Sequence, residues 1–233
     1  MEARFLRPLY LGESIAPYRL LEPVTAVIPW DSDGQNLLDA TLAQQQGYGH
    51  LARWLQGAEA LWQQHGRGNM TLLQQVNYYG KLSAQFPPAP LRVVYSKAGT
   101  LPAAAVLREN QAFIDHTLYW ARMDNLAEAQ YLEAILNSET ARARVAHLQA
   151  RGQWGARHFD KVLFETLIHQ FAPSSDIHQG LARAAAARAE EVAGDVQLPE
   201  GLHFVAVRRR IRQALAEEGV AGEIERLVEQ LLR

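Results

Sequence analysis

The pattern of hydrophobic and polar residues predicts short strands in the first part of this chain, followed by helices. An apolar run at 5–11 ends at a glycine, and three prolines interrupt a β-branched run at 18–30, so we expect edge strands or short broken strands. The turn-forming residues 31–34 should start a helix over 36–46. A second, amphipathic helix follows, with apolar residues at intervals of three and four. These residues are Leu51, Trp54, Leu55, Ala58, Leu61 and Trp62, and we expect both tryptophans to face a core.

Three further segments have the composition of strands. They cover 91–96, 103–107 and 112–120, and all of them can belong to one antiparallel sheet. Consecutive strands without long helices between them favour an α+β fold over a doubly wound sheet. We therefore expect a small antiparallel or mixed sheet packed with helices in the first half of the chain.

The final third is predicted to be helical. Apolar spacing predicts a helix over 126–137, and the polar pair Asn137-Ser138 can end it and cap a second helix over 139–148. A short β-leaning segment at 162–170 precedes an alanine-rich helix at 177–192, a hinge at 198–201 and two closing helices. We expect one α+β domain over 1–172 and a helical C-terminal extension over 173–233.

Composition places the chain among soluble globular proteins. It has 233 residues, of which 48% are hydrophobic and 21% charged, and no apolar run approaches the roughly 20 residues that span a bilayer. We see no signal peptide and expect a cytoplasmic protein. The absence of cysteine excludes disulfides, thiolate metal sites and a cysteine nucleophile.

Charge is unevenly distributed, although the formal net charge is only −2. Residues 142–161 contain five cations against one acid, and four arginines lie within 208–212. Local patches determine affinity for phosphate more than the total does. Arginine outnumbers lysine 20 to 3, which favours bidentate contacts to phosphate or guanine, although a GC-rich genome would give the same ratio. For the arginines at 208–212 we expect salt bridges between the tail and the body.

The segment 149–161 is the most informative part of the sequence. It combines two glycines with Trp154, Arg151, Arg157, His158 and Lys161. A flexible, cationic and aromatic loop suits an anionic polymer better than a small substrate. The alternative is an ordinary surface loop that its aromatic residues fix to the core.

Several enzyme classes lack their signatures here. The sequence has no phosphate-binding glycine loop, no dinucleotide fingerprint and no serine elbow. Its eight histidines form no i, i+4 pair around a glutamate, and none of its three lysines completes the acid–x–lysine triplet of restriction nucleases. His116, beside Asp115 in a predicted strand, is expected to be a buried, hydrogen-bonded histidine. We therefore expect a binding module without catalytic activity, metal or cofactor of its own.

Scattered pieces of the sequence resemble the C-terminal target-recognition region of N6-adenine DNA methyltransferases and fused restriction–modification enzymes. The resemblance covers about residues 9 to 172 and depends on the order in which the pieces occur. The pieces are residues 11–19, 77–82, 92–95, 113–115, 131–138 and 155–161.

The resemblance implies that the chain recognises double-stranded DNA for a separate catalytic domain or subunit. That domain would bind S-adenosylmethionine and flip the adenine, and its catalytic signature and cofactor-binding glycine segment are absent here. The resemblance also implies DNA-contacting positions. In the loop these are Arg151, Gly152, Trp154, Arg157, His158 and Lys161, and at the edge of the sheet Lys81, Arg92 and Lys97 would contact phosphates.

Physical reasoning divides these roles. Arg151 or Arg157 can read a guanine edge, while Lys161 and Arg144 hold phosphates. His158 and Asp160 can instead hydrogen-bond within the loop. Two alternatives to DNA recognition stay open. One is a protein-interaction subunit that docks through its apolar helices, with the tryptophans as interface, and the other is a metal-dependent hydrolase.

Overall fold

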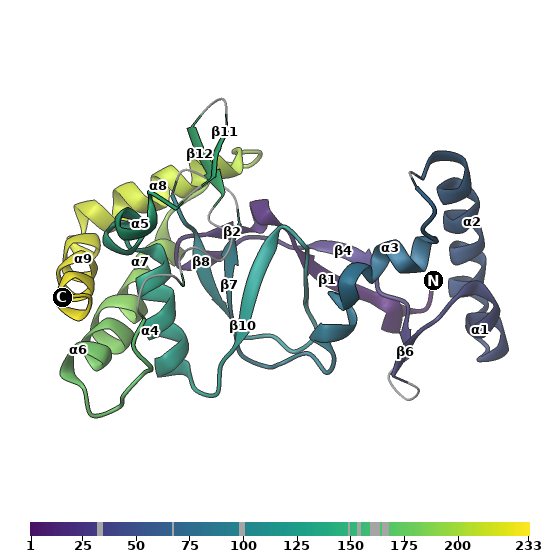
Figure 1. The fold of residues 1–233 in the computed structure, drawn as a ribbon, viewed down its shortest axis with the longest axis horizontal. Helices are drawn as coiled ribbons and strands as arrows, with labels where there is room; N and C mark the ends of the chain where they lie inside the picture. Colours follow the sequence, from purple (N-terminus) through teal and green to yellow (C-terminus); the bar gives the residue numbers. More distant parts are fainter. Residues whose placement is uncertain are drawn as a thin grey trace. The chain divides into compact units, whose positions relative to one another are not determined.

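The computed structural model describes residues 1–31, 35–66, 68–97, 101–148, 150–152, 155–158, 164 and 168–233, and for 150–152, 155–158, 184 and 185 only the backbone. The chain forms two compact units (Figure 1). The first comprises Met1–Leu9, Val24–Ala89 and Gln111–Phe113, and the second comprises Tyr10–Pro23, Pro90–Asn110 and Ile114–Arg233.

The first unit combines small sheets with three helices. One sheet has the strand order β4-β1-β9, and β1 pairs with β4 in antiparallel register. The short strands β5 and β6 form a separate antiparallel pair. The bounds are β1 Leu6–Tyr10, β4 Val24–Val27, β5 Trp30–Asp31, β6 Asn36–Leu37, β9 Phe113–Ile114, α1 Ala40–Gln45, α2 Gly49–His65 and α3 Leu72–Val76.

Two apolar clusters hold the first unit together. Helices α1 and α2 bury their inner residues, among them Leu51 and Leu55, around Phe5. In the second cluster the ring of Phe86 stacks on Trp30 with centroids 4.0 Å apart and contacts Phe113. Burial of these rings is the main contribution to the stability of so small a unit.

The second unit is built on the antiparallel sheet β10-β7-β8, with β7 as its central strand. Helix α4 packs on one face of this sheet, and helices α6 to α9 enclose a larger apolar core (Figure 1). The bounds are β2 Ile15–Ala16, β3 Arg19–Leu20, β7 Arg92–Ser96, β8 Ala104–Leu107, β10 Leu118–Arg122, β11 Ala150–Gly152, β12 Gly155–His158, α4 Leu126–Asn137, α5 Glu139–Val145, α6 Asp176–Gln179, a π-helical segment Gly180–Ala186, α7 Ala187–Asp195, α8 Phe204–Glu217 and α9 Val220–Leu231.

The structure confirms the predicted α+β class and the helical final third. Helix α4 covers the predicted range, and the closing helices α8 and α9 form a hairpin after the hinge. The expected division at 172/173 does not coincide with the two units. Ile135 and Leu181, from opposite sides of that boundary, belong to one buried cluster. The C-terminal helices therefore complete the core of the second unit.

Two element predictions were wrong in part. Residues 36–37 form β6, and α1 begins only at Ala40, because Asp39 caps it by accepting a hydrogen bond from the backbone N of Leu42 (2.7 Å). The predicted strand at 112–120 is two strands, since a turn separates β9 from β10 and the two belong to different sheets.

Candidate nucleic-acid interface

A side-chain latch joins the end of α4 to the edge strand β8. The buried amide of Asn137 accepts a hydrogen bond from the backbone N of Ala104 (3.0 Å) and donates one to the Ala104 carbonyl (3.0 Å). One turn earlier on the same face, Glu133 accepts from the backbone N of Val106 (3.0 Å). The side chains of α4 thus satisfy backbone N–H groups of the edge strand β8.

The start of α5 is fixed by one carboxylate. Glu225 of α9 accepts hydrogen bonds from the Ser138 hydroxyl (2.8 Å) and from the backbone N of Glu139 (2.8 Å) and Thr140 (2.9 Å). Ser138 caps the same helix through Ala141, as its sequence position predicts. A negative charge at a helix N-terminus is favourable. The short helix is therefore held in place, and its last turn carries Arg142 and the exposed Arg144.

A two-stranded hairpin follows α5. Gly152 pairs with Gly155, Arg151 pairs with Ala156, and Ala150 pairs with His158. The register shift between Ala150 and Arg151 leaves Arg157 as an extra residue, which is a β-bulge. Figure 1 shows the hairpin projecting from the border of the second unit.

The two strands of the hairpin contain four of the ten residues predicted to reach DNA. The structure describes the backbone of Arg151, Gly152, Arg157 and His158. Arg151 is paired across the hairpin, whereas Arg157 is the extra residue of the bulge. The remaining predicted loop contacts, Trp154 and Lys161, and the expected pairing partner Asp160 lie outside the described residues.

A cation and several aromatic rings lie together on the sheet of the same unit. The ammonium group of Lys97 is 4.8 Å from the centroid of the Tyr119 ring. Tyr119 stacks with Tyr95, which also contacts the exposed ring of Phe164. A small hollow of about 180 Å³ lies among these rings, with Trp120 in its wall. Tyr95 is buried, whereas Tyr119 is partly exposed, and a partly exposed ring with an adjacent cation is a common surface for nucleic acid.

Arg92 is not a phosphate contact at the edge of the sheet, which corrects the sequence prediction. It lies on the central strand β7 and is 0% exposed, and its Nη2 donates to the Glu109 carbonyl (2.8 Å). Burial lowers the pKa of this guanidinium, and the nearby Glu109 carboxylate raises it. Lys81 belongs to the first unit, where it is exposed in the segment that follows α3.

The C-terminal arginines bind backbone carbonyls rather than the expected carboxylates. Arg208 donates to the carbonyls of Ile15 (2.8 Å) and Gly12 (2.7 Å), and Arg212 donates to the Pro102 carbonyl. Burial, followed by the neighbouring Arg212, lowers the pKa of Arg208 to about 10. Arg208 and Arg212 therefore anchor α8 to the body of the unit.

The expectation of a buried His116 in a strand was wrong. It lies in the turn between β9 and β10 with its side chain 71% exposed, and its Nδ1 is 2.8 Å from Oδ2 of Asp115. Hydrogen bonds from Thr117 and His116 lower the pKa of Asp115 despite partial burial, which alone would raise it. Across the described part of the chain, no three histidine, aspartate or glutamate side chains are grouped to hold a metal ion.

Sequence reasoning missed the residues that position this surface. Asn137 and Glu225 each make several hydrogen bonds that join segments distant in sequence. The polar pair at the end of α4 was visible in the sequence, but its partner Ala104 was not. Nothing in the run of acids at 217–229 distinguishes Glu225 from its neighbours.

Comparisons with known proteins are sparse. No model of a known protein family and no curated protein matches the sequence. Among solved structures, the type IIG restriction endonuclease BpuSI matches with a TM-score of 0.46 and 14% identity, over 99% of this chain and 27% of that chain. This chain thus spans about a quarter of the length of that protein, and a similarity of this size does not assign it to a family. Separately, none of the helices in the described ranges is long and apolar enough to cross a membrane.

Proposed function

We propose that this chain recognises double-stranded DNA on behalf of an adenine-N6 methyltransferase in a restriction–modification system, and that it has no catalytic activity of its own. The observation that carries this proposal is the bulged hairpin β11–β12, which places two arginines and a histidine on a narrow antiparallel ribbon. The major groove of B-DNA admits a two-stranded β-ribbon, and arginine is the commonest reader of guanine edges there.

The surroundings of the hairpin support the same role. Arg144, in the last turn of the capped helix α5, is exposed. Lys97 and the Tyr119 ring form a second candidate contact site for DNA on the same unit, with one cation and one aromatic ring. Phosphate contacts of this kind would fix the position of the protein along the duplex, while the ribbon reads the bases. The resemblance of residues 11–19, 131–138 and 155–161 to target-recognition regions points to a methyltransferase as the partner.

The salt dependence of DNA binding tests this proposal. Affinity of the purified chain for a mixed pool of duplexes should fall as salt rises, with a slope of about 0.9 per phosphate neutralised. Exchange of Arg151→Gln together with Arg157→Gln should weaken binding and reduce that slope by up to about 2. The matched control exchanges Arg209→Gln and Arg210→Gln, two exposed cations of α8. Equal loss in both variants would show non-specific charge attraction and contradict a role for the hairpin.

The methyltransferase partner needs a separate test. The chain should co-purify with an adenine-methyltransferase catalytic domain and direct methylation to one DNA sequence. S-adenosylmethionine should bind that partner, so calorimetry on this chain alone should give no heat of binding. Methylation of adenine by the isolated chain would contradict the non-catalytic role.

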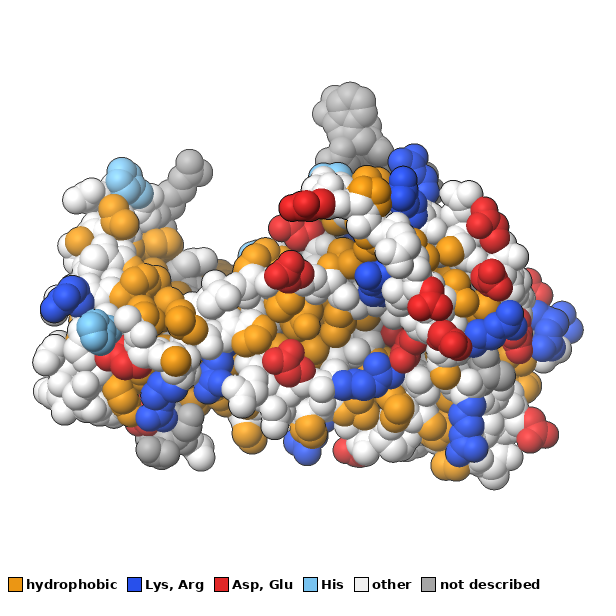
Figure 2. Space-filling view, turned by 180° about the vertical axis from the view of Figure 1, so that it is seen from behind, with side chains coloured by type: hydrophobic (Ala, Val, Ile, Leu, Met, Phe, Trp, Pro, Cys, Tyr) orange, Lys and Arg blue, Asp and Glu red, His pale blue; other side chains and the backbone are white. Residues whose placement is uncertain are grey.

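A second candidate function, protein binding by the first unit, is favoured by its surface. Nine of the thirteen large hydrophobic side chains exposed in the described part of the chain belong to this unit, and Figure 2 shows hydrophobic side chains gathered across it on the left. On α2, Trp54 is 45% exposed and Leu61 is 61% exposed. The expectation that Trp54 faces a core was therefore wrong, whereas Trp62 is half-buried and donates to the Met70 carbonyl (2.7 Å). Footprinting of Trp54 with and without the methyltransferase would reveal such a contact.

A further inference from the structure

Tyr79 is held in an unusual position on the first unit. Its backbone lies in the left-handed region (φ 53°, ψ 27°), which bulky side chains rarely adopt, and its side chain is 83% exposed. A conformation of this kind persists only where the surroundings impose it. Because the ring is almost fully exposed, packing within the unit does not explain why it is there.

The segment around Tyr79 is rigidly anchored. The side-chain oxygen of Asn77 accepts hydrogen bonds from the backbone N of Leu82 (3.1 Å) and Ser83 (2.9 Å). The Ser83 hydroxyl donates to the Gly80 carbonyl (3.1 Å), and Leu82 is buried in the aromatic cluster of the unit. These contacts fix the backbone on both sides of Tyr79, so the ring is presented in a defined place.

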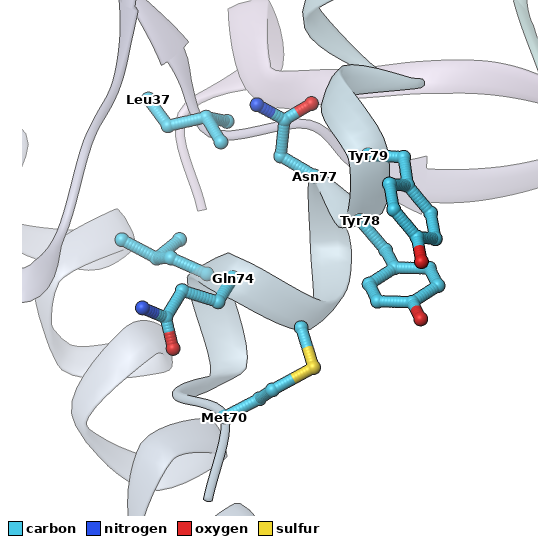
Figure 3. Close-up of a pocket in the computed structure, with 7 residues that line it drawn as sticks. Leu37, Met70, Gln74, Asn77, Tyr78 and Tyr79 are labelled. Atoms are coloured by element: carbon cyan, nitrogen blue, oxygen red, sulfur yellow. The ribbon is translucent and has the colours of Figure 1, made fainter.

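Tyr78 and Tyr79 together form an aromatic platform. Their ring centroids are 4.3 Å apart with a tilt of 57°, and Figure 3 shows both rings on the outer side of the segment. A hydrogen bond between the two side chains, followed by their electrostatic interaction, raises the pKa of Tyr78. The Tyr78 phenol therefore stays neutral near pH 7, as a surface for an anionic polymer requires.

A hollow of about 520 Å³ adjoins the platform (Figure 3). Leu37, Met70 and Leu73 give it apolar walls, and Gln74 and Asn77 bring amide groups to it. The oxygens of both amides already accept backbone hydrogen bonds, from Thr71 in the case of Gln74 (2.9 Å). Their NH₂ groups remain as donors toward a ligand, and the lining residues include no acid.

From this geometry we infer that the platform and its hollow bind one unpaired nucleobase of a DNA substrate, an inference that rests on the proposed function. The ring of the base stacks on Tyr79, and the acceptor atoms on the edge of the base receive hydrogen bonds from the side-chain amides of Gln74 and Asn77. The exposed Lys81, two residues after Tyr79, holds the adjoining phosphate. A neighbouring hollow that shares Met70 and Leu73 is lined by Asp39 and Glu59. These acids repel phosphate, so the site takes a single base and not a continuous strand.

The test compares two DNA ligands, a fully paired duplex and the same duplex with one unpaired base. The unpaired base should strengthen binding to the wild-type chain by about 5- to 100-fold, the range that base–aromatic stacking gives. Tyr79→Gly should abolish this preference, and Tyr79→Phe should keep it. Since glycine adopts the left-handed conformation freely, Tyr79→Gly should not lower Tm. Trp54→Ala, another exposed aromatic of the same unit, is the matched control and should leave the preference for the unpaired base unchanged.

The outcomes separate this inference from the proposed function. A wild-type chain that binds both ligands equally, or a Tyr79→Gly variant that retains the preference, overturns the inference and leaves duplex recognition standing. Binding of the unpaired ligand alone supports the inference and contradicts duplex recognition. Binding of neither ligand overturns both, and the platform would then be a protein contact.

Discussion

Helices α4–α5 and the hairpin β11–β12 are consecutive in the second unit and use their polar residues in opposite ways. In α4, Glu133 and Asn137 are buried, and each satisfies a backbone group of β8. The strands of the hairpin pair only with each other among the described elements, and one arginine occupies a bulge. Polar residues of the helices therefore stabilise the unit, whereas we assign those of the hairpin to recognition. Substitutions in the two regions should separate stability from DNA binding.

The largest effect on stability is expected from Asn137→Ala. The change removes three hydrogen bonds and leaves the buried N–H of Ala104 without its side-chain partner, while the Ala104 carbonyl keeps a hydrogen bond from the backbone N of Tyr18 (2.9 Å). An unsatisfied buried group costs about 1–3 kcal/mol, so the free energy of unfolding should fall by about 3 kcal/mol. Urea unfolding measures it. The exposed Asn110→Ala serves as control, and a loss below about 1 kcal/mol would contradict the latch.

Arg208→Ala should have the next largest effect. It removes charge-assisted hydrogen bonds to the carbonyls of Gly12 and Ile15 and leaves both less well satisfied. We expect a loss of about 2 kcal/mol in urea unfolding. Arg209→Ala on the exposed side of α8 should stay within about 0.5 kcal/mol of wild type. Similar losses in both variants would mean that Arg208 acts only through general charge.

A smaller effect, visible as pH dependence, is expected at Glu133. Burial raises the pKa of Glu133 well above its usual value, and the nearby Glu190 carboxylate raises it further. Glu190 itself forms an ion pair with Arg108 (2.6 Å). The folded state then keeps a proton that the unfolded state loses, so this group makes stability fall as pH rises above about 4.3, by at most about 1.4 kcal/mol per pH unit. Glu133→Gln should remove this component. Parallel stability–pH curves for the two proteins would contradict the assignment.

The sequence was sufficient for elements whose signals are local. The apolar spacing of α4, the cap at Ser138 and the hinge before α8 all depend on neighbouring residues, and the structure bears them out. Long-range partners were not predictable. Arg92 looked like any other cation in a strand, and only the position of β7 between β8 and β10 shows that it is buried.

The same limit applies to the candidate sites. The cationic composition of 149–161 drew attention to the hairpin, but the bulge at Arg157 depends on strand register. The Tyr78-Tyr79 pair was visible only as part of a resembling segment. Its significance comes from the left-handed backbone at Tyr79 and from the adjacent hollow, which includes Leu37 from an earlier strand.

The most direct test of the account is the charge-reversed pair Arg151→Glu with Arg157→Glu, measured for both DNA affinity and thermal unfolding. We expect duplex binding to be abolished while Tm stays close to that of the wild type, because the hairpin recognises DNA and the helices hold the unit together. Undiminished DNA affinity in a folded variant would contradict it.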